Sequence, residues 1–546
     1  MQKTLLVTTI ALLSAYMACG TGNGGAPDIP GDSGGQDTGI VEDATKDTTD
    51  GLEAVEDALP TTPGGLPLSL PFVLTRPDPG EPLPDAEIAD FTARMTGLWK
   101  QIDFFTWVYE TTHGTDASTG MPDYLIWWHD VVAVKEGDKV TFRNSAKDGG
   151  SHNNAEPTML VLAQAIGGYL LTGDPAMGRV VEQFTKSITA VMKGFVYDEN
   201  DPIQHLMARN IITINQEFVL PSGKKKAVDY SEWYFSYEGW NADRFEYKHN
   251  PVWGDVWVTN KRSKDDVPYF YRVAAWLPYL IELTDDETIR GAAQEALDLL
   301  EQFARDIVDH GWQIRTKDKD GNAVFVEGQD LDDFVTYTDL IPDAECDPRL
   351  ATALLGYDDP LDQDCGNGQG SLYDTVAEAG HYFNHDIIDQ FHMAALALAL
   401  TRGKTDVAKE LLKGLIIRIE RYRNPSADEP GQEDENWEKD IARLLLMAAS
   451  LGYPLNNDEA RQIQKVYLRT VEAYEDFPRW DLWDKSVPDG EYSFRDGGMY
   501  PKHQPQYIRI EDIAFVLEYC WSPFKNPAGI QFVDCELVKD PKHWGG

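Results

Sequence analysis

The sequence predicts a mainly all-α protein in which helical hairpins are joined by loops and β-hairpins are minor elements. From residue 85 onward, apolar residues recur about every 3.6 positions instead of alternating strictly, which is typical of amphipathic helices. One unit, an apolar helix, a tight polar turn and a second helix, occurs at 159–184, 270–304, 391–419 and 441–468. Repeated helical hairpins indicate either an α-solenoid or a closed α/α toroid.

The lengths of the units and their linkers favour the toroid. The units differ too much from one another for a uniform solenoid, and short turns alternate with long aromatic loops at 221–266, 312–370 and 473–509. In a closed ring of hairpins, one face carries the short turns and the other carries the long loops that build a site. We therefore expect a single toroid-like domain over residues 66–546.

The individual elements follow from the same pattern. A first helical stretch covers 85–112, with an apolar stripe that includes Phe91, Met95 and Trp99. Each later unit has Gly, Asp or Pro at its turn, where one helix stops and the next is capped. Segments 131–142 and 312–326 are predicted β-hairpins around Gly-containing turns. The second holds 318–322, which resembles a calcium loop but lacks the later Glu at EF-hand spacing, so a turn is favoured.

The N-terminal residues indicate export. Lys3 precedes an apolar run, 5–13, that is too short to span a bilayer, so 1–18 is predicted to be a signal peptide. The stretch Tyr16-Met17-Ala18-Cys19 resembles the lipobox of bacterial lipoproteins, although these usually carry Leu where Tyr16 stands. The resemblance implies a lipid on Cys19, which anchors the exported protein to the cell envelope, at the outer membrane on its periplasmic or surface face. An ordinary secretory signal is the alternative.

The segment after Cys19 is predicted to be a disordered acidic tether. Residues 20–65 contain no aromatic residue, ten acidic residues and one lysine. Such a composition cannot bury enough apolar surface to offset the entropy of ordering. We expect 19–65 to be a solvated linker and the folded domain to begin near Leu66.

The remaining cysteines form two local pairs. Cys346 and Cys365 lie close in sequence, as do Cys520 and Cys535, and an exported protein with this pattern most simply has two disulfides, Cys346–Cys365 and Cys520–Cys535. A metal site is the alternative, but the close C-x₂-C spacing it favours is absent.

Charge and missing motifs exclude several functions. The formal net charge is −43, of which the tether contributes −9 from its ten acidic residues and one lysine. A strongly acidic domain argues against nucleic acid and, less strongly, against polyanionic substrates. The chain has no G-x-S-x-G, P-loop or H-E-x-x-H motif and no convincing G-x-G-x-x-G, which disfavours serine hydrolases, nucleotide-binding proteins and zinc proteases.

A first candidate site precedes the helix of the first unit. Asn154 is a suitable N-cap, and Glu156 and Pro157 suit the first helical turn, where N–H groups lack partners. These helix-start preferences account for Asn154, Glu156 and Pro157 but not for His152 and Asn153. We therefore regard His152 and Glu156 as candidate catalytic residues, and Asn153 and Asn154 as candidate substrate contacts.

A second candidate site is a polar cluster before the second unit. Asp266, which precedes Val267 and Pro268, is a suitable N-cap. In the alternative, Asp265 or Asp266 is kept ionised by neighbouring cations and acts as nucleophile or base. The candidate substrate contacts around them are Trp253, Trp257, Lys261, Arg262 and Lys264.

Three histidines lie close together before the third unit. On one continuous helix His381, His385 and His392 would lie at about 0°, 40° and 20°, with Glu378 about 60° to one side. Such a face suits general acid–base catalysis in a cleft, with His381 as catalytic residue and His385 as substrate contact. The alternative is a metal site. If the helix breaks at Asn384, this alignment is lost. No cofactor is expected, and a metal ion is the alternative.

The last candidate segment, 492–512, is a Gly- and Pro-rich loop before a helix expected from Ile513. Long ordered loops are commonly functional, and the alternative is a disulfide-supported plug over the last helices. Asp512 is a candidate catalytic residue, and the candidate substrate contacts are Arg495, Tyr507 and Arg509.

At the level of architecture, the expected toroid resembles that of many glycoside hydrolases and polysaccharide lyases. The resemblance implies a poly- or oligosaccharide ligand. A hydrolase, which needs two carboxyl groups, is favoured over a lyase, to which Tyr and Arg residues of 492–512 with His152 as base are also suited. The alternative is a non-catalytic surface lipoprotein that binds glycans or supports the envelope. In the hydrolase, Asp265 or Asp266 is one carboxyl, and the second is open among Glu156, Glu378 and Asp512.

Overall fold

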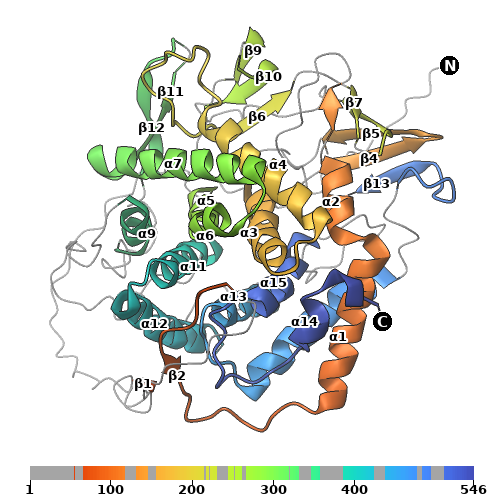
Figure 1. Cartoon of the computed structure of the whole chain (residues 1–546), viewed down its shortest axis with the longest axis vertical. Coiled ribbons are helices and arrows are strands. Elements are labelled where there is room, and N and C mark those ends of the chain that lie inside the picture. The colour runs from red at the N-terminus through yellow and green to blue at the C-terminus, as the bar shows by residue number, and fades with distance from the viewer. Residues whose placement is uncertain are drawn as a thin grey trace, which may run out of the picture. The chain divides into compact units, whose positions relative to one another are not determined.

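Helices dominate this computed structural model, and the strands form small sheets at its edges (Figure 1). Residues 51–546 form one compact unit, to which every described element belongs. The structure describes residues 54–55, 66–112, 114–116, 131–144, 155–213, 217–220, 222–229, 244–250, 252–260, 266–318, 320–330, 346–356, 385–423, 437–475, 482–493 and 510–545.

The four predicted helical hairpins are confirmed. They are α3 (Ala155–Thr172) with α4 (Pro175–Met192), α5 to α7, α11 (His385–Thr401) with α12 (Thr405–Arg423), and α13 (Trp437–Ser450) with α14 (Asn457–Glu475). In the second unit, α5 (Val267–Ala274) and α6 (Leu277–Leu283) precede α7 (Glu287–Asp309). Pro278 explains the break, because proline has no N–H to donate to the preceding turn.

Capping at the turns follows the expected chemistry. The Asp174 carboxylate accepts hydrogen bonds from the backbone N–H groups of Ala176 and Met177, at 2.9 and 3.0 Å, where α4 begins. Asp286 caps α7 in the same way. The predicted 85–112 stretch is two helices, α1 (Asp85–Ile102) and α2 (Phe104–Thr112), because Asp103 adopts a left-handed conformation with φ of 47°.

Five of the described helices contact one another in a closed series. Each of α3, α5, α11, α13 and α15 (Ile510–Trp521) packs against the next, and α15 packs against α3 (Figure 1). Other helices lie against this series, which we call the helix ring: α4 on α3, α12 on α11 and α14 on α13. Around them, α1 packs on α14, and α9 (Cys346–Gly356) packs on both α7 and α11.

The helices of the ring run in the same direction, because their C-terminal ends meet. The Ser522 hydroxyl, after α15, donates to the Ser450 carbonyl at the end of α13. Trp276, after α5, lies 5.9 Å from Phe524 between ring centroids. Near the end of α3, a Cβ on Gly168 would lie 2.6 Å from the Trp521 side chain. The Tyr279 hydroxyl donates to the Thr401 carbonyl, 2.5 Å away, at the end of α11. The N-terminal ends therefore lie together at the opposite end of the ring.

The sheets correct the all-α expectation. A six-stranded mixed sheet has the strand order β13-β4-β5-β8-β7-β3. Its hairpin of β4 (Val131–Glu136) and β5 (Lys139–Asn144) was predicted, but the other strands were not. They are β3 (Thr115–Asp116), β7 (Glu217–Val219), β8 (Lys225–Asp229), which is parallel to β5, and β13 (Gly490–Ser493). These strands are short and come from distant parts of the chain, so they leave little periodicity in the sequence.

The other sheets are smaller. A three-stranded sheet has the order β6-β10-β9, with β6 (Asn210–Thr213), β9 (Arg244–Asn250) and β10 (Gly254–Thr259). The second predicted hairpin is confirmed as β11 (Gln313–Lys317) and β12 (Ala323–Asp330). The fourth sheet joins β2 (Val73–Leu74) to β1 (Ala54–Val55), two residues of the expected tether.

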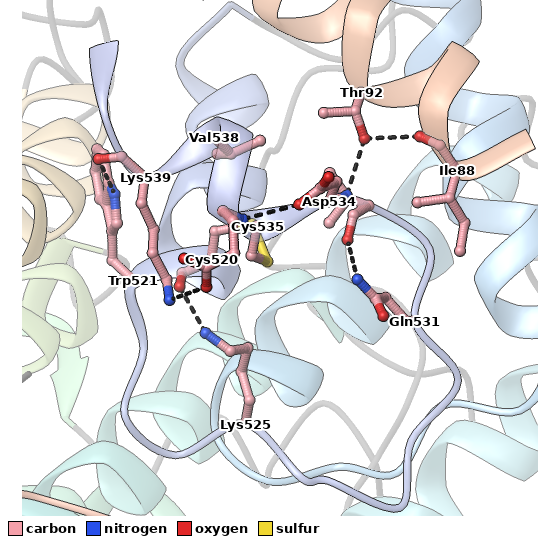
Figure 2. The surroundings of a disulfide bond; sticks show 12 residues. Ile88, Thr92, Cys520, Trp521, Lys525, Gln531, Asp534, Cys535, Val538 and Lys539 are labelled. Carbon is pink, nitrogen blue, oxygen red and sulfur yellow. Dashed lines mark hydrogen bonds and ion pairs between the residues drawn. A yellow bond between two sulfur atoms is a disulfide. The ribbon is translucent and has the colours of Figure 1, made fainter. Parts of the chain in front are cut away.

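The predicted disulfide between Cys520 and Cys535 is confirmed (Figure 2). It joins the end of α15 to the start of the short helix α16 (Cys535–Val538). Beside it, the Lys525 ammonium donates to the Cys520 carbonyl at 2.6 Å. Burial, with a smaller contribution from nearby Lys539, lowers the pKa of Lys525 to about 7. The predicted Cys346–Cys365 pair lies outside the description, since Cys365 and the Cys346 side chain are not among the described groups.

Candidate functional site

The candidate segments from the sequence lead into the helix ring at the end where its helices begin. Residues 151–154 precede α3, 261–265 precede α5, 381–384 precede α11 and 494–509 precede α15. These segments lie outside the described residues. The described residues relevant to the candidate site are therefore the helix starts and the polar residues of the ring interior.

Two nearly buried carboxyl groups lie at neighbouring helix starts. Glu156 is in the first turn of α3 with 8% of its surface exposed, and Asp266 directly precedes α5 with 2% exposed. Helices α3 and α5 pack against each other. Since both helices begin at the same end of the ring, Glu156 and Asp266 lie at that same end although they are distant in sequence.

Asp266 does not cap α5, so the capping interpretation is wrong. Its backbone has φ of −77° and ψ of −25°, and its side chain makes no capping hydrogen bond. A side-chain N-cap normally needs an extended backbone at the capping residue, and Asp266 is already helical. Pro268 in the first turn also removes one N–H that would need a partner. Helix capping therefore does not explain this buried carboxyl.

A buried ion pair joins four helices inside the ring. Arg272 on α5 is 1% exposed, and its Nη2 lies 2.5 Å from Oε2 of Glu518 on α15. Its Nη1 lies 3.1 Å from Sδ of Met447 on α13 and 3.5 Å from Oε1 of Gln390 on α11. The guanidinium also lies over the Phe515 ring, 5.1 Å from the centroid. The pairing compensates two charges that would otherwise be costly to bury.

The fifth helix of the ring adds a buried amide to this interior. Gln164 on α3 is buried, and among the described residues neither its Nε2 nor its Oε1 has a hydrogen-bond partner. The same holds for Oε1 of Glu518. Both residues line one small cavity together with Trp276, Trp521 and Ser522. Buried polar atoms without partners are uncommon, and they mark the ring interior as a polar centre within an apolar fold.

The start of α11 is fixed from outside the ring. Nε of Arg418 on α12 lies 2.8 Å from Oδ1 of Asp389, and Nη2 of Arg418 donates to the Tyr422 hydroxyl at 2.6 Å. Helix α11 begins at His385, directly after Asn384, where the sequence suggests a helix break. Of the three candidate histidines, His381 and the side chain of His385 lie outside the described groups.

The two tryptophans expected to contact substrate are parts of the protein interior. Trp253 is 8% exposed, and its Nε1 donates to the Lys193 carbonyl at 2.9 Å. Its indole is therefore not available for stacking on a ligand, which corrects that expectation. Trp257 on β10 is half-buried and packs against the hydrophobic core.

The remaining candidates are not described in atomic detail. Helix α15 begins at Ile510, three residues before the expected Ile513, so Asp512 lies in its first turn, although its side chain is outside the described groups. The residues that lie wholly outside the description are Cys19, His152, Asn153, Asn154, Lys261, Arg262, Lys264, Asp265, Glu378, His381, Arg495, Tyr507 and Arg509.

The loop that resembles a calcium site is built as a turn. Oδ1 of Asp318 accepts hydrogen bonds from the backbone N–H groups of Asp320 and Asn322, at 2.8 and 2.9 Å. Asp side chains commonly stabilise tight turns in this way. Among the described residues, no group of three or more His, Cys, Asp or Glu side chains is placed to hold a metal ion.

The sequence did carry a signal for the residues of the ring interior, which were missed. Gln164, Arg272 and Glu518 are single polar residues inside apolar stretches, for example Glu518 in Ala514–Tyr519. A lone charged residue in a helix that is otherwise apolar is rarely buried without a partner.

No helix in the described part of the chain combines the length and apolar character needed to cross a bilayer. Comparisons with protein-family models, with curated proteins and with solved structures found no match to this chain.

Proposed function

We propose that this protein is a glycan-active enzyme, a glycoside hydrolase, whose site lies at the end of the helix ring where the five helices begin. The observation that carries the proposal is the pair of nearly buried carboxyls, Glu156 and Asp266, at neighbouring helix starts. Acidic side chains are seldom this deeply buried, and buried acidic groups are enriched at functional sites. The Asp266 side chain makes no capping hydrogen bond to α5.

We further infer that the helical part of the chain is an α/α toroid. The closed series of contacts through α3, α5, α11, α13 and α15 supports this, as do the outer helices that pack on it. The common direction of the ring helices also supports it, because all five then begin at one end of the ring.

The proposed chemistry needs one carboxyl to donate a proton and another to accept one. Inverting glycosidases hold their two carboxyl groups about 6.5–9.5 Å apart, so the scheme requires this separation between the carboxyls of Glu156 and Asp266. In this scheme Asp266 takes a proton from the attacking water while Glu156 donates a proton to the leaving oxygen. The bond from the anomeric carbon to that oxygen breaks as the bond to the water oxygen forms.

The Arg272–Glu518 pair is assigned a positioning role. It ties α5, which Asp266 precedes, to α15. Loss of either partner shifts the helix that positions Asp266, so both partners affect the site without contact with substrate.

We also propose that the protein is exported and anchored through a lipid on Cys19. The Cys520–Cys535 disulfide supports export, because disulfides persist in oxidising compartments. Replacement of Cys19 by Ser tests the anchor: the variant should be released or remain an uncleaved precursor. If Cys19→Ser protein still partitions into detergent as an acylated mature form, the lipid is not on this residue.

The function is tested with a panel of polysaccharides. Released reducing ends report hydrolysis, and absorbance of unsaturated uronides reports lyase action. On any substrate that is cleaved, Asp266→Asn and Glu156→Gln should lower kcat at least about 10²-fold, the lower end for acid–base catalysis. The matched control is Asp174→Asn, at a helix start on the opposite end of the ring.

The outcomes separate the alternatives. Unchanged activity in both variants would remove Glu156 and Asp266 from the mechanism. Binding without any cleavage would identify a non-catalytic glycan-binding protein. A protein that neither binds nor cleaves any glycan of the panel contradicts the proposal.

A further inference from the structure

The six-stranded sheet carries a groove that is separate from the helix starts. It runs along the β4–β5 turn and the β7–β8 hairpin, with Trp483 at its side, and encloses about 620 Å³. Ligand sites in proteins have volumes of about 300–1,000 Å³. None of its lining residues belongs to the helix ring.

The groove is lined by charges of both signs in nearly equal number. Its lining holds three carboxylates, Glu136, Asp138 and Glu217, and three accessible ammonium groups, which belong to Lys139, Lys224 and Lys225. Lys226 is buried in the sheet, with its ammonium 5.6 Å from the Phe142 ring centroid and 5.2 Å from that of Phe218. With Lys226 included, the lining has four lysines and three carboxylates, so in a chain with a net charge of −43 this surface is close to charge balance and rich in both donors and acceptors.

Trp483 gives the groove one fixed aromatic surface. Its Nε1 donates to the Lys225 carbonyl at 3.0 Å, and its ring lies 6.3 Å from the Phe142 ring between centroids. These two contacts set the orientation of the indole. The Lys224 ammonium lies 5.6 Å from the ring centroid.

We propose that this groove binds a neutral oligosaccharide. Sugar hydroxyls donate to carboxylates and accept from ammonium groups, and the apolar face of a sugar ring packs against an indole. The carboxylates repel an anionic ligand and the lysine ammonium groups repel a cationic one. An uncharged polyhydroxylated ligand experiences neither repulsion. The choice of a saccharide rests on the proposed function, but the groove itself is defined independently of it.

The groove extends the proposed function to substrate capture. A polysaccharide chain held on the sheet stays close to the ring while other parts of the chain exchange at the helix starts. Linked sites raise the effective concentration of ligand at the second site. The groove therefore predicts a greater advantage for long substrates than for short ones.

Binding is measured by calorimetry on the full-length mature chain with Asp266→Asn, so that the ligand is not consumed. The probes are cellohexaose, maltohexaose and mannohexaose, with hexagalacturonate as the anionic comparison. At least one neutral hexasaccharide should bind, and hexagalacturonate should bind at least about tenfold more weakly. Trp483→Ala should weaken the neutral interaction at least about tenfold, because tryptophan is enriched among the residues that contribute most to binding energy.

Two further variants keep the test valid if Trp483→Ala disturbs the sheet. Glu217→Gln changes an exposed side chain of the groove and should weaken binding several-fold without loss of folding. The controls are Phe325→Ala, an exposed aromatic residue on β12 with 52% of its surface accessible, and Lys485→Ala, an exposed lysine outside the groove. Neither control should alter the affinity.

The proposal is overturned if none of the neutral probes binds, if Glu217→Gln and Trp483→Ala bind as the parent does, or if the anionic probe binds best. Cleavage of a polysaccharide that depends on Asp266, without groove binding, contradicts the groove alone. Groove binding together with full activity of Asp266→Asn and Glu156→Gln contradicts the proposed active site alone.

Discussion

The two ends of the helix ring bury different chemistry. Where the helices begin, Glu156 and Asp266 place carboxyl groups at nearly inaccessible positions. Where they end, the contacts are aromatic or involve the main chain, as between Trp276 and Phe524. A buried carboxylate costs free energy unless hydrogen bonds or an ion pair compensate for its lost hydration. Buried aromatic rings instead stabilise a fold through the apolar area they remove from water. We call the end at which the ring helices terminate the closing end and the end at which they begin the opening end. The comparison teaches that contacts between the five helices are concentrated at the closing end, whereas the buried carboxyls lie at the opening end.

The Arg272–Glu518 pair lies between these ends, and its disruption should have the largest effect. Glu518→Ala leaves the Arg272 charge buried without its partner, so the free energy of unfolding should fall by about 3–5 kcal/mol. Denaturant titration followed by circular dichroism measures the change. The double variant Arg272→Met/Glu518→Leu should recover most of the loss, because it removes both charges and keeps the volume. A loss below about 1 kcal/mol in the single variant would show that the pair does not organise the ring.

The closing end depends next on the disulfide. Cys520→Ala/Cys535→Ala opens a crosslink between residues 15 positions apart, so the unfolding free energy should fall by about 3 kcal/mol. The melting temperature under non-reducing conditions measures the effect. Activity per folded molecule should stay unchanged, since the crosslink lies at the end of α15 and not at its start. A loss of activity greater than the loss of folded protein would contradict the separation of the two ends.

A smaller effect separates an acidic residue that caps a helix from one that does not. Asp174 accepts two backbone hydrogen bonds at the start of α4, so Asp174→Ala should lower the unfolding free energy by about 1 kcal/mol, whereas Asp174→Asn should be nearly silent. Neither variant should change activity. Asp266→Asn should show the reverse pattern, with a melting temperature near that of the parent and a large loss of turnover. Similar behaviour of the two residues would remove the distinction between the ends.

The helical hairpins could be predicted because their signals are local. Asp174 and Gly173 mark one turn within a few residues of the helices that they separate, and the apolar stripe of each helix is continuous in sequence. The six-stranded sheet could not be predicted, because β13 pairs with β4 and β8 pairs with β5 across long stretches of chain. No local pattern specifies such partners, particularly for strands of two to five residues.

The candidate site was predictable in part for the same reason. Helix starts next to polar clusters pointed to Glu156 and Asp266, but the sequence left Asp266 open between a helix cap and a catalytic carboxyl. Only the structure shows that its helical backbone makes no capping hydrogen bond. Trp253 was expected at the surface because it belongs to an aromatic segment, yet the Lys193 carbonyl holds it inside. Burial depends on distant partners, so sequence patterns indicate where polar residues occur more reliably than which of them face a ligand.

Lys525 provides the most subtle test of the closing end. Its pKa of about 7 in the folded protein lies below the ordinary lysine value of about 10.4. Between these two values the unfolded chain binds more protons than the folded one, so this group makes the unfolding free energy rise with pH from about 7 upward. The slope for one proton is at most about 1.4 kcal/mol per pH unit. Because Lys525 is half titrated near pH 7 and partly accessible, we expect less than about 1 kcal/mol between pH 7 and 8.

The Lys525→Met variant isolates this contribution from other titrating groups. Below pH 7 the parent buries a charged ammonium, so the variant should gain stability relative to the parent, and the gain should shrink as the pH rises to 8. The hydrogen bond from Lys525 to the Cys520 carbonyl is lost at every pH in the variant, so it shifts the difference without changing its slope. Lys542→Met, at an exposed lysine of the same C-terminal segment, is the control and should give a difference independent of pH. A flat difference for Lys525→Met as well would mean that Lys525 stays protonated up to pH 8, and that the closing end contains a stably buried charge.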